Sequence, residues 1–222
     1  MKVLAVAAHP DDETLGAGGT LLKHLSRGDQ VFWLILTAPS PDDWPAEMVS
    51  RCLSQVQSVA DAYGFTETIE LGMPAAGMDL VSMRDVVDGI SGALRAIKPD
   101  RIYTVGDTDA HTDHLVAFEG LMLALKPFRP DYDIESIYSY EVLSSTDAAT
   151  GWRHKNFVPN VYSDVCEFLE RKLEIMNLFE NQLQPEPLPR SSSSIRALAR
   201  YRGATIGIEY AEAFSVVRQI IR

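Results

Sequence analysis

Two short clusters of histidine and acidic side chains are the part of this sequence best suited to chemistry. The first is the run HPDDE at residues 9–13, which directly follows an apolar stretch. The second spans residues 107–114, follows another apolar stretch and contains His111 and His114. Three of the five histidines of the chain lie in these clusters. Imidazole nitrogens and carboxylate oxygens form a donor set that zinc prefers, so the clusters indicate a metal site.

The candidate ligands suit a catalytic zinc site. Such a site has three protein ligands and one open position for water. His9, Asp12 and His114 can supply the ligands, which leaves Asp11 and His111 free for proton transfer. Zinc lowers the pKa of its bound water towards about 7, and Asp11 can accept the proton of that water as a general base. The two clusters therefore predict metal-assisted hydrolysis.

His111 can have a role of its own in such a reaction. If protonated, it can stabilise an oxyanion and later help an amine to leave. Asp113 or Asp109 can hold its ring in position. Helix capping is a simpler explanation of both clusters, because acidic side chains favour helix N-termini. Capping alone explains neither His9 nor the place of the first cluster directly after an apolar stretch.

The elements that must position the clusters follow from the apolar pattern. Residues 3–8 form a continuous apolar run, typical of a strand buried on both faces of a parallel sheet. Residues 16–25 predict a helix and residues 31–37 a second strand, which completes a βαβ unit. The same alternation predicts helices at residues 46–63, 83–97, 115–125, 166–182 and 195–201, and strands at residues 68–71, 101–105, 134–142 and 213–220.

This order predicts an α/β fold that is Rossmann-like, with a mostly parallel, doubly wound sheet and helices on both faces. Ligands of such sheets bind at the carboxyl ends of the strands, where both clusters fall. The first and fourth strands can be neighbours across the switch point, so we expect the clusters to face each other. The 222 residues contain no repeat or interdomain linker, and we expect a single domain over residues 1–222.

Composition narrows the partners and the compartment. The net charge is −11 and no basic run occurs, which argues against a nucleic-acid partner. No stretch of about 18 apolar residues is present to span a membrane, and the N-terminus does not resemble a signal peptide. We therefore expect a cytoplasmic protein that acts on a small molecule. A homo-oligomer stays possible, because the helix expected at residues 166–182 can pack against the sheet or against a second copy.

A family resemblance becomes visible at these motifs. The run AHPDDE at residues 8–13, followed by GAGGT at residues 16–20, resembles the signature of the PIG-L/LmbE-like zinc N-deacetylases. HTDH at residues 111–114 resembles the second motif of that family, and AEAF at residues 211–214 is also similar to family members. The resemblance extends along nearly the whole chain. It implies a zinc-dependent hydrolase that removes an N-acetyl group from an N-acetylglucosamine-like amino sugar or glycoside.

The resemblance also implies a role for each site residue. The implied roles are His9, Asp12 and His114 as metal ligands, Asp11 as general base, His111 as oxyanion-stabilising residue with Asp113 behind it, and Arg51 as a substrate contact. Arg51 is the least specific of these, because an arginine on an exposed helix face is commonly only solvated.

The chain departs from the family pattern in the substrate region. Many relatives have a glutamate one turn after the arginine, where this chain has Gln55. Many also have an aspartate after the third strand, where this chain has Ala75 and Ala76. These departures leave the hydrolytic prediction intact and leave the sugar unnamed.

Alternatives remain open at this point. A different metallohydrolase can act on another amide or ester, or on a phosphoester, although no obvious cationic phosphate clamp lies near the clusters. A sugar- or nucleotide-binding module without catalysis would leave Asp11 and His111 without a purpose. Iron or cobalt can occupy the same nitrogen and oxygen site.

A few side chains elsewhere are further candidates for contact with a substrate. Trp44 and Trp152 lie in expected loops, where an aromatic face can stack on a sugar ring or simply pack at a rim. Arg190 and Arg202 can contact a polar substrate, but their sequence positions alone do not place them near the clusters.

Overall fold

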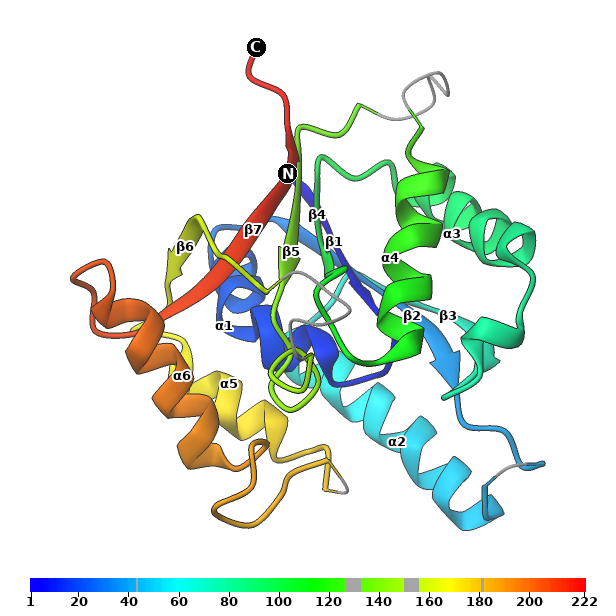
Figure 1. The fold of residues 1–222 in the computed structure, drawn as a ribbon, viewed down its shortest axis with the longest axis horizontal. Helices are drawn as coiled ribbons and strands as arrows, with labels where there is room; N and C mark the ends of the chain where they lie inside the picture. The colour runs from blue at the N-terminus through cyan, green and yellow to red at the C-terminus, as the bar shows by residue number, and fades with distance from the viewer. Residues whose placement is uncertain (43, 127–132, 150–155, 181) are drawn as a thin grey trace.

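A mixed sheet forms the centre of the molecule. The structure, a computed structural model, describes residues 1–42, 44–126, 133–149, 156–180 and 182–222. In these residues seven strands form one sheet in the order β3-β2-β1-β4-β5-β7-β6 (Figure 1). The strands are β1 (Lys2–Ala7), β2 (Gln30–Ala38), β3 (Glu67–Pro74), β4 (Arg101–Val105), β5 (Ser136–Tyr140), β6 (Val161–Asp164) and β7 (Ala211–Gln219).

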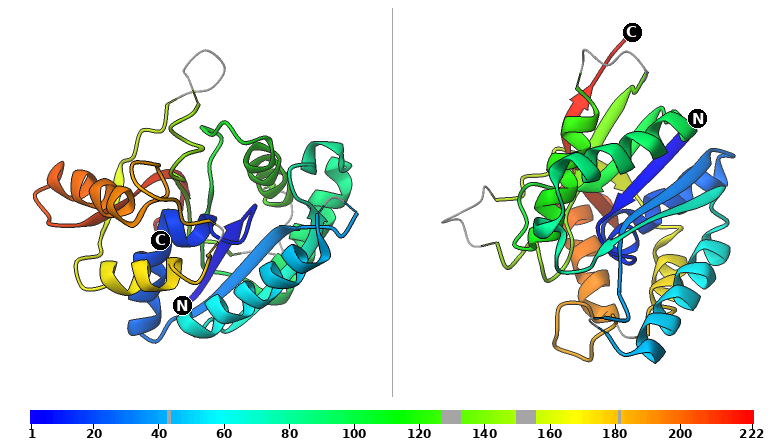
Figure 2. Two further views of the ribbon diagram at one scale, coloured as in Figure 1. Left: turned by 90° about the horizontal axis from the view of Figure 1, so that it is seen from below. Right: turned by 90° about the vertical axis from the view of Figure 1, so that its right-hand side faces the viewer.

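Helices cover both faces of this sheet. They are α1 (Asp12–Ser26), α2 (Ala46–Tyr63), α3 (Met83–Ile97), α4 (Thr112–Ala124), α5 (Leu169–Met176) and α6 (Ser192–Ala204), with a 3-10 turn η1 (Met78–Leu80). α3 packs against α4 on one face, and α5 packs against α1, α2 and α6 on the other (Figures 1 and 2). Strands β1 to β5 pair in parallel, whereas β7 is antiparallel to β5 and β6. The predicted α/β, doubly wound fold is confirmed.

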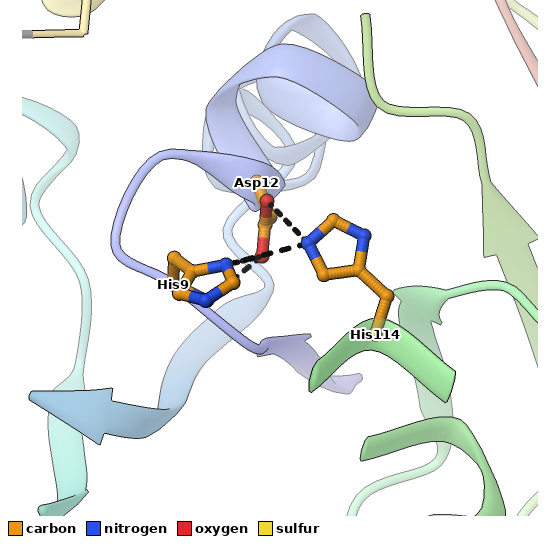
Figure 3. Close-up of side chains that lie close together, drawn as sticks. All are labelled: His9, Asp12 and His114. Carbon is orange, nitrogen blue, oxygen red and sulfur yellow. Dashed lines mark hydrogen bonds and ion pairs between the residues drawn. The ribbon is translucent and has the colours of Figure 1, made fainter. Parts of the chain in front are cut away.

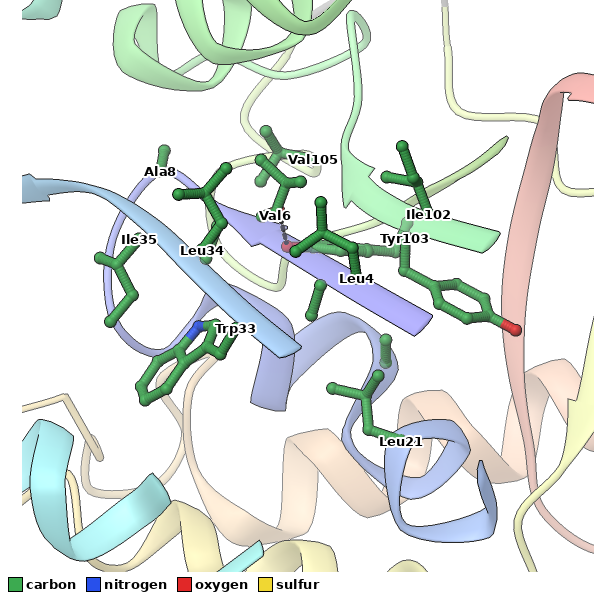
Figure 4. Packing of buried hydrophobic residues seen from close by; sticks show 14 of the residues in the cluster. Leu4, Val6, Ala8, Leu21, Trp33, Leu34, Ile35, Ile102, Tyr103 and Val105 are labelled. Atoms are coloured by element: carbon green, nitrogen blue, oxygen red, sulfur yellow. Dashed lines mark hydrogen bonds between the residues drawn. The ribbon is translucent and has the colours of Figure 1, made fainter. Parts of the chain in front are cut away.

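Apolar strands form the core because both of their faces are covered. Figure 4 shows Leu4, Leu34 and Ile102 projecting towards one face of the sheet, with Trp33 and Leu21 on the other. All five side chains are fully buried. Full burial of an apolar side chain of this size contributes about 1.5–3 kcal/mol. This packing fixes the first, second and fourth strands as a rigid platform.

The order of the strands creates the switch point that the sequence predicted. From β1 the chain moves outward through β2 and β3, and then returns to place β4 on the other side of β1. β1 and β4 are parallel neighbours, with Ala5 opposite Tyr103. Their carboxyl ends therefore meet at one edge of the sheet, and the loops that follow them face each other.

Two elements differ from the sequence expectation. The helix expected at residues 166–182 is shorter, because the amides of Leu178 and Phe179 bond carbonyls only three residues back and form turns. Phe179 is still buried, which explains why the apolar spacing continued past the helix. The strand β6 was not expected, since its four residues show no alternation and form a strand only by pairing with β7.

Candidate metal centre and active-site cleft

The three candidate ligands lie at the carboxyl edge of the sheet, in the turn that follows β1 and in the first turn of α4. A turn joins β1 to α1, and in it the backbone N–H of His9 donates to Asp12 Oδ2 at 2.8 Å. This bond holds His9 and Asp12 on the same side of the turn. His114 lies in the first turn of α4, which begins soon after β4 ends. The adjacency of β1 and β4 brings the two turns together.

The ligand atoms of these residues converge on one point (Figure 3). His9 Nδ1 lies 3.3 Å from His114 Nε2, which lies 3.2 Å from Asp12 Oδ1. His9 Nδ1 and Asp12 Oδ2 are 3.6 Å apart. Tetrahedral zinc with bonds of about 2.0–2.1 Å separates its ligand atoms by roughly 3.3 Å. The buried Asp12 Oδ1 also accepts no hydrogen bond, so the residues fit a divalent cation.

Each ligand histidine has a carboxylate on its outer nitrogen. His9 Nε2 lies 2.9 Å from Asp113 Oδ2, and His114 Nδ1 lies 3.1 Å from Asp109 Oδ2. The hydroxyls of Ser145 and Thr146 donate to Asp109 at 3.0 and 2.8 Å. Such outer carboxylates fix the tautomer and the ring orientation of metal-binding histidines.

Asp113 is itself held by the loop that follows β3. Its carboxylate accepts the backbone amides of Ala76 at 2.7 Å and Met78 at 3.1 Å. Ala76 has a left-handed φ of 57°, a conformation that costs a residue with a Cβ about 1–2 kcal/mol. The loop that follows β3 therefore supports the candidate metal centre through the backbone amides of Ala76 and Met78.

Asp113 does not stand behind the ring of His111, as the resemblance had implied. Its carboxylate bonds His9 instead, and only its backbone N–H contacts His111, donating to Nδ1 at 3.2 Å. The reason is local, because His111 is the N-cap residue of α4 and its ring accepts the free amide there. Asp109 supports His111 through the backbone, accepting its N–H at 2.9 Å.

The protonation of the histidines follows from these contacts. Burial lowers the pKa of His111, and the neighbouring His9 and His114 lower it further. His111 is therefore neutral at pH 7 rather than protonated, with its hydrogen on Nε2 because Nδ1 accepts. Burial also lowers the pKa of His9, but hydrogen bonds to Asp113 and Asp12 outweigh burial and raise it to about 9.

Asp11 and Asp12 are adjacent in the sequence but lie in different environments. Asp11 is 1% exposed, and burial, followed by the charge of Asp12, raises the pKa of its carboxyl. Arg190 acts against this rise, and its Nη1 donates to Asp11 Oδ2 at 2.7 Å. Burial also acts to raise the pKa of Asp12, but His114 and His9 hold it well below the usual range.

Arg190 is fixed by two other side chains. Its Nε donates to Ser144 Oγ at 2.9 Å and its Nη1 to Gln182 Oε1 at 2.9 Å. The candidate substrate arginine of the C-terminal part thus reaches the site, although it lies 179 residues from Asp11 in the sequence.

A cleft of about 270 Å³ opens onto the centre. It is lined by His9, Pro10, Asp11, Thr37, Pro39, Trp44, Met48, Cys52, Ala75, Ala76, His111, Gln182 and Arg190. The size suits a small ligand, since binding clefts for such ligands are a few hundred Å³. Trp44 lies at its rim, where the sequence had left stacking and packing open.

Other sequence candidates lie elsewhere. Arg51 is exposed, pairs with Glu47 at 3.1 Å and is not among the residues that line the cleft. Arg202 makes two hydrogen bonds to Glu141, at 2.8 and 2.6 Å, and also lies outside the cleft lining. Trp152 falls outside the described residues.

Sequence reasoning did not find all of the cleft. Met48 and Cys52 are one helical turn apart and were not expected at the site. The sequence indicated only that Met48 and Cys52 lie on the same helix as Arg51. The sequence predicts a helix that ends at Gln182, whereas α5 ends at Met176 and Gln182 lines the cleft.

Comparison with known proteins places the chain among deacetylases. The family model described as PIG-L, GlcNAc-PI de-N-acetylase, matches residues 4–125. The diacetylchitobiose deacetylase of Thermococcus kodakarensis is 26% identical over 97% of this chain and 83% of its own length. A 1D-myo-inositol 2-acetamido-2-deoxy-α-D-glucopyranoside deacetylase of Rhodococcus opacus is 30% identical over 52% of this chain and 41% of its own length.

Among solved structures, proteins with different reactions share the fold. The N,N′-diacetylchitobiose deacetylase of Pyrococcus horikoshii, solved with an inhibitor, aligns with a TM-score of 0.74 and 22% identity over 97% of this chain and 83% of that one. The 4-carboxy-2-hydroxymuconate hydratase GalB of Pseudomonas putida aligns with a TM-score of 0.77 and 15% identity over 100% and 98%. The fold alone therefore does not select the reaction.

Proposed function

Because the chain belongs to the PIG-L family of de-N-acetylases, we propose that it is a zinc-dependent hydrolase that removes an N-acetyl group from an N-acetylglucosamine-like amino sugar or glycoside. The observation that carries this proposal is the convergence of His9, Asp12 and His114 beside the buried Asp11, with His9 and Asp11 lining one cleft. A hydrolytic centre needs this combination of ligands and a base.

His9, Asp12 and His114 would hold the cation through two imidazole nitrogens and a carboxylate. This donor set suits zinc, and it also accepts iron or cobalt. A bound cation supplies a Lewis acid and lowers the pKa of water towards about 7. Asp109 and Asp113 hold the two ligand histidines in the tautomers that such binding requires.

Asp11 is placed to move the proton of the reaction. Burial raises the pKa of its carboxyl, which makes it a stronger base than an exposed aspartate. It accepts a proton from the attacking water and delivers a proton to the amide nitrogen as the C–N bond breaks. The products are then the free amine and acetate. Arg190 acts against this rise in pKa and orients the carboxylate by donating to Oδ2 at 2.7 Å.

His111 is placed to stabilise the negative charge that develops on the carbonyl oxygen. Its ring lines the cleft, 4.5 Å from that of His9 between centroids. Nδ1 accepts the Asp113 amide, so the Nε2–H is free to donate. A neutral donor of this kind in a low-dielectric site contributes about 2.7–4 kcal/mol to catalysis.

A substrate panel tests the proposal. The protein is stripped of metal, reloaded with one equivalent of zinc and assayed for amine release from N-acetylglucosamine, its glycosides and other N-acyl compounds. A parallel panel of phosphoesters is assayed for phosphate. We expect amine release from the N-acetyl sugars alone. Phosphate release without amine release would replace the proposal with the phosphoesterase alternative.

A further inference from the structure

The cleft has one wall that the proposed chemistry does not use. We define the α2 wall as Pro39, Trp44, Met48 and Cys52, all of which line the cleft. Trp44 is 39% exposed and Met48 is 37% exposed, so both present apolar surface to solvent. Met48 and Cys52 are one helical turn apart, so they present one face of α2 to the cleft.

Charged side chains of α2 point elsewhere. Glu47 and Arg51 pair with each other at 3.1 Å, and neither lines the cleft. On the adjoining loop, Ala75 and Ala76 also line the cleft. No described residue on this side of the cleft carries a charge.

Other residues of the cleft lining are polar. Gln182 and Arg190 line the cleft, and Arg190 Nη1 donates to Gln182 Oε1 at 2.9 Å. His9 and Asp11 line the same cleft. The cleft therefore offers both hydrogen-bonding groups and apolar surface, which suits an amphipathic ligand.

We propose that the substrate is an N-acetyl amino sugar that carries an apolar substituent, such as an aryl aglycone, and that the α2 wall binds this substituent. The inference rests on the proposed function. The metal centre is continuous with the wall within one cleft, so a bound sugar would bring its substituent onto Trp44 and Met48. A substituent that covers Trp44 and Met48 would remove their exposed apolar surface from water.

Paired substrates test the inference. The zinc-loaded protein is assayed for amine release from N-acetylglucosamine and from both anomers of its phenyl glycoside. We expect kcat/KM to be at least tenfold higher for one phenyl glycoside than for the free sugar. Most of the difference should lie in KM, because the aglycone does not take part in the reaction.

Matched variants assign the preference to the wall. Met48→Ser and Trp44→Ala should each lower the ratio of kcat/KM for the preferred phenyl glycoside to kcat/KM for the free sugar at least threefold. Leu53→Ser is the control, because Leu53 is also an exposed apolar residue of α2, at 49%, but does not line the cleft. It should leave the preference as in the wild type.

The outcomes separate this inference from the proposed function. Equal kcat/KM for the free sugar and both phenyl glycosides would overturn the inference and leave the deacetylase intact. No amine release from any of these sugars by zinc-loaded protein would go against the proposed function itself. Sedimentation of the wild type and of Met48→Ser gives a further outcome. If Met48→Ser keeps the preference for the phenyl glycoside but dissociates a wild-type dimer, the α2 wall binds a second copy of the chain, and the inference is overturned.

Discussion

Asp11 and Asp12 are adjacent carboxylates for which we propose different roles, and their surroundings give them different pKa values. Both are buried, so desolvation acts to raise the pKa of each. Asp12 lies beside His9 and His114, which hold its pKa low, as the proposed role of a metal ligand requires. Asp11 faces the cleft with Arg190 as its partner, and its pKa is raised. Groups whose environments separate their pKa values in this way commonly divide the work of an active site.

Replacement of Asp11 isolates its role. Asp11→Asn keeps the shape of the side chain but removes the base. We expect amine release to fall about 10²–10⁴-fold, the usual contribution of a general base, while one equivalent of zinc stays bound. Activity and metal content of the same sample check this. Full activity with bound metal would remove Asp11 from the mechanism.

Cation binding should compete with protons at the ligand histidines. Before a cation binds, the pKa of His9 is raised to about 9 and that of His114 to about 10, because nearby carboxylates outweigh burial. His9 Nδ1 and His114 Nε2 are 3.3 Å apart, so only one proton fits between them. Metal ligation needs these nitrogens deprotonated. We expect zinc binding at pH 7 to release at least one proton, and zinc affinity to rise with pH up to about 10.

Calorimetry measures that proton directly. Zinc is titrated into the protein at pH 7 in two buffers that differ in ionisation enthalpy. The expected result is a heat that differs between the buffers by the enthalpy of at least one proton. Identical heats, after correction for zinc binding to the buffers, would contradict the assigned protonation.

Helix α1, which begins at Asp12 and has Asp11 as its N-cap residue, is held by a buried ion pair. Lys172 of α5 donates to the carbonyl of Leu15 at 2.8 Å and to Glu212 Oε1 at 2.8 Å. The same oxygen accepts the amide of Gly19 at 2.8 Å. In an uninterrupted helix the backbone amide of Gly19 would donate to the carbonyl of Leu15. The ion pair therefore inserts into α1, which changes direction along its length in Figure 2.

Two glycines of the GAGGT motif permit this approach. A Cβ on Gly18 would lie 3.2 Å from the side chain of Lys172 and 2.6 Å from the hydroxyl of Tyr63. A Cβ on Gly19 would lie 2.8 Å from Val165. The motif thus serves close packing around α1, and together with Glu212 it directs the first turn of α1 towards the metal centre.

A variant of the ion pair tests whether α1 positions the centre. Glu212→Gln leaves Lys172 without its counter-charge, which costs about 3–5 kcal/mol of stability in a buried pair. Because α1 carries Asp12, we expect zinc affinity to fall at least tenfold as well, measured by competition with a chelator. Leu94→Ala in α3 is the control. Leu94 is fully buried on the other face of the sheet, and its replacement lowers stability by about 2–5 kcal/mol, an amount similar to that expected for Glu212→Gln.

The two variants must be distinguished by metal affinity rather than by stability. Both should lower the melting temperature, but only Glu212→Gln should weaken zinc binding. If zinc affinity falls equally in both, the ion pair is a stabilising contact without a positioning role. The cobalt(II) absorption spectrum gives a second reading, because it responds to ligand geometry and not to global stability.

Sequence predicted those parts of the site that are local in the chain. The candidate ligands His9, Asp12 and His114 could be named because they lie in the two segments that follow apolar strands, and the strand order brings these segments together. Arg190 could be suspected but not placed, since its bond to Asp11 joins positions 179 residues apart. The pairing of Glu212 with Lys172 could not be predicted, because no local sequence pattern marks a lysine whose side chain bonds the backbone of another helix.

At the scale of the whole molecule, a cation would join separate parts of the chain. His9 and Asp12 follow β1, whereas His114 follows β4. The sequence predicted this adjacency because continuous apolar runs mark parallel strands, and the doubly wound order is confirmed. The single domain over residues 1–222 and the cytoplasmic location stay predictions. No helix in the described ranges combines the length and apolarity needed to cross a bilayer.

Zinc should therefore stabilise the fold as a whole. A ligand that binds only the native state at a concentration of 100 times its Kd adds about 2.7 kcal/mol. For a chain of this size each kcal/mol raises the melting temperature by about 2–4 °C, so we expect an increase of about 5–10 °C. Thermal unfolding with and without zinc measures this. An unchanged melting temperature in His9→Ala is the control.

The most direct test of the account follows metal content and catalysis in one sample. Zinc is counted by mass spectrometry, and amine release from an N-acetylglucosamine glycoside is measured before chelation, after chelation and after zinc is restored. The account predicts one zinc per chain at full activity, loss of both on chelation and return of both with zinc. Amine release that persists without metal, or a protein that binds no zinc when it is supplied, would contradict it.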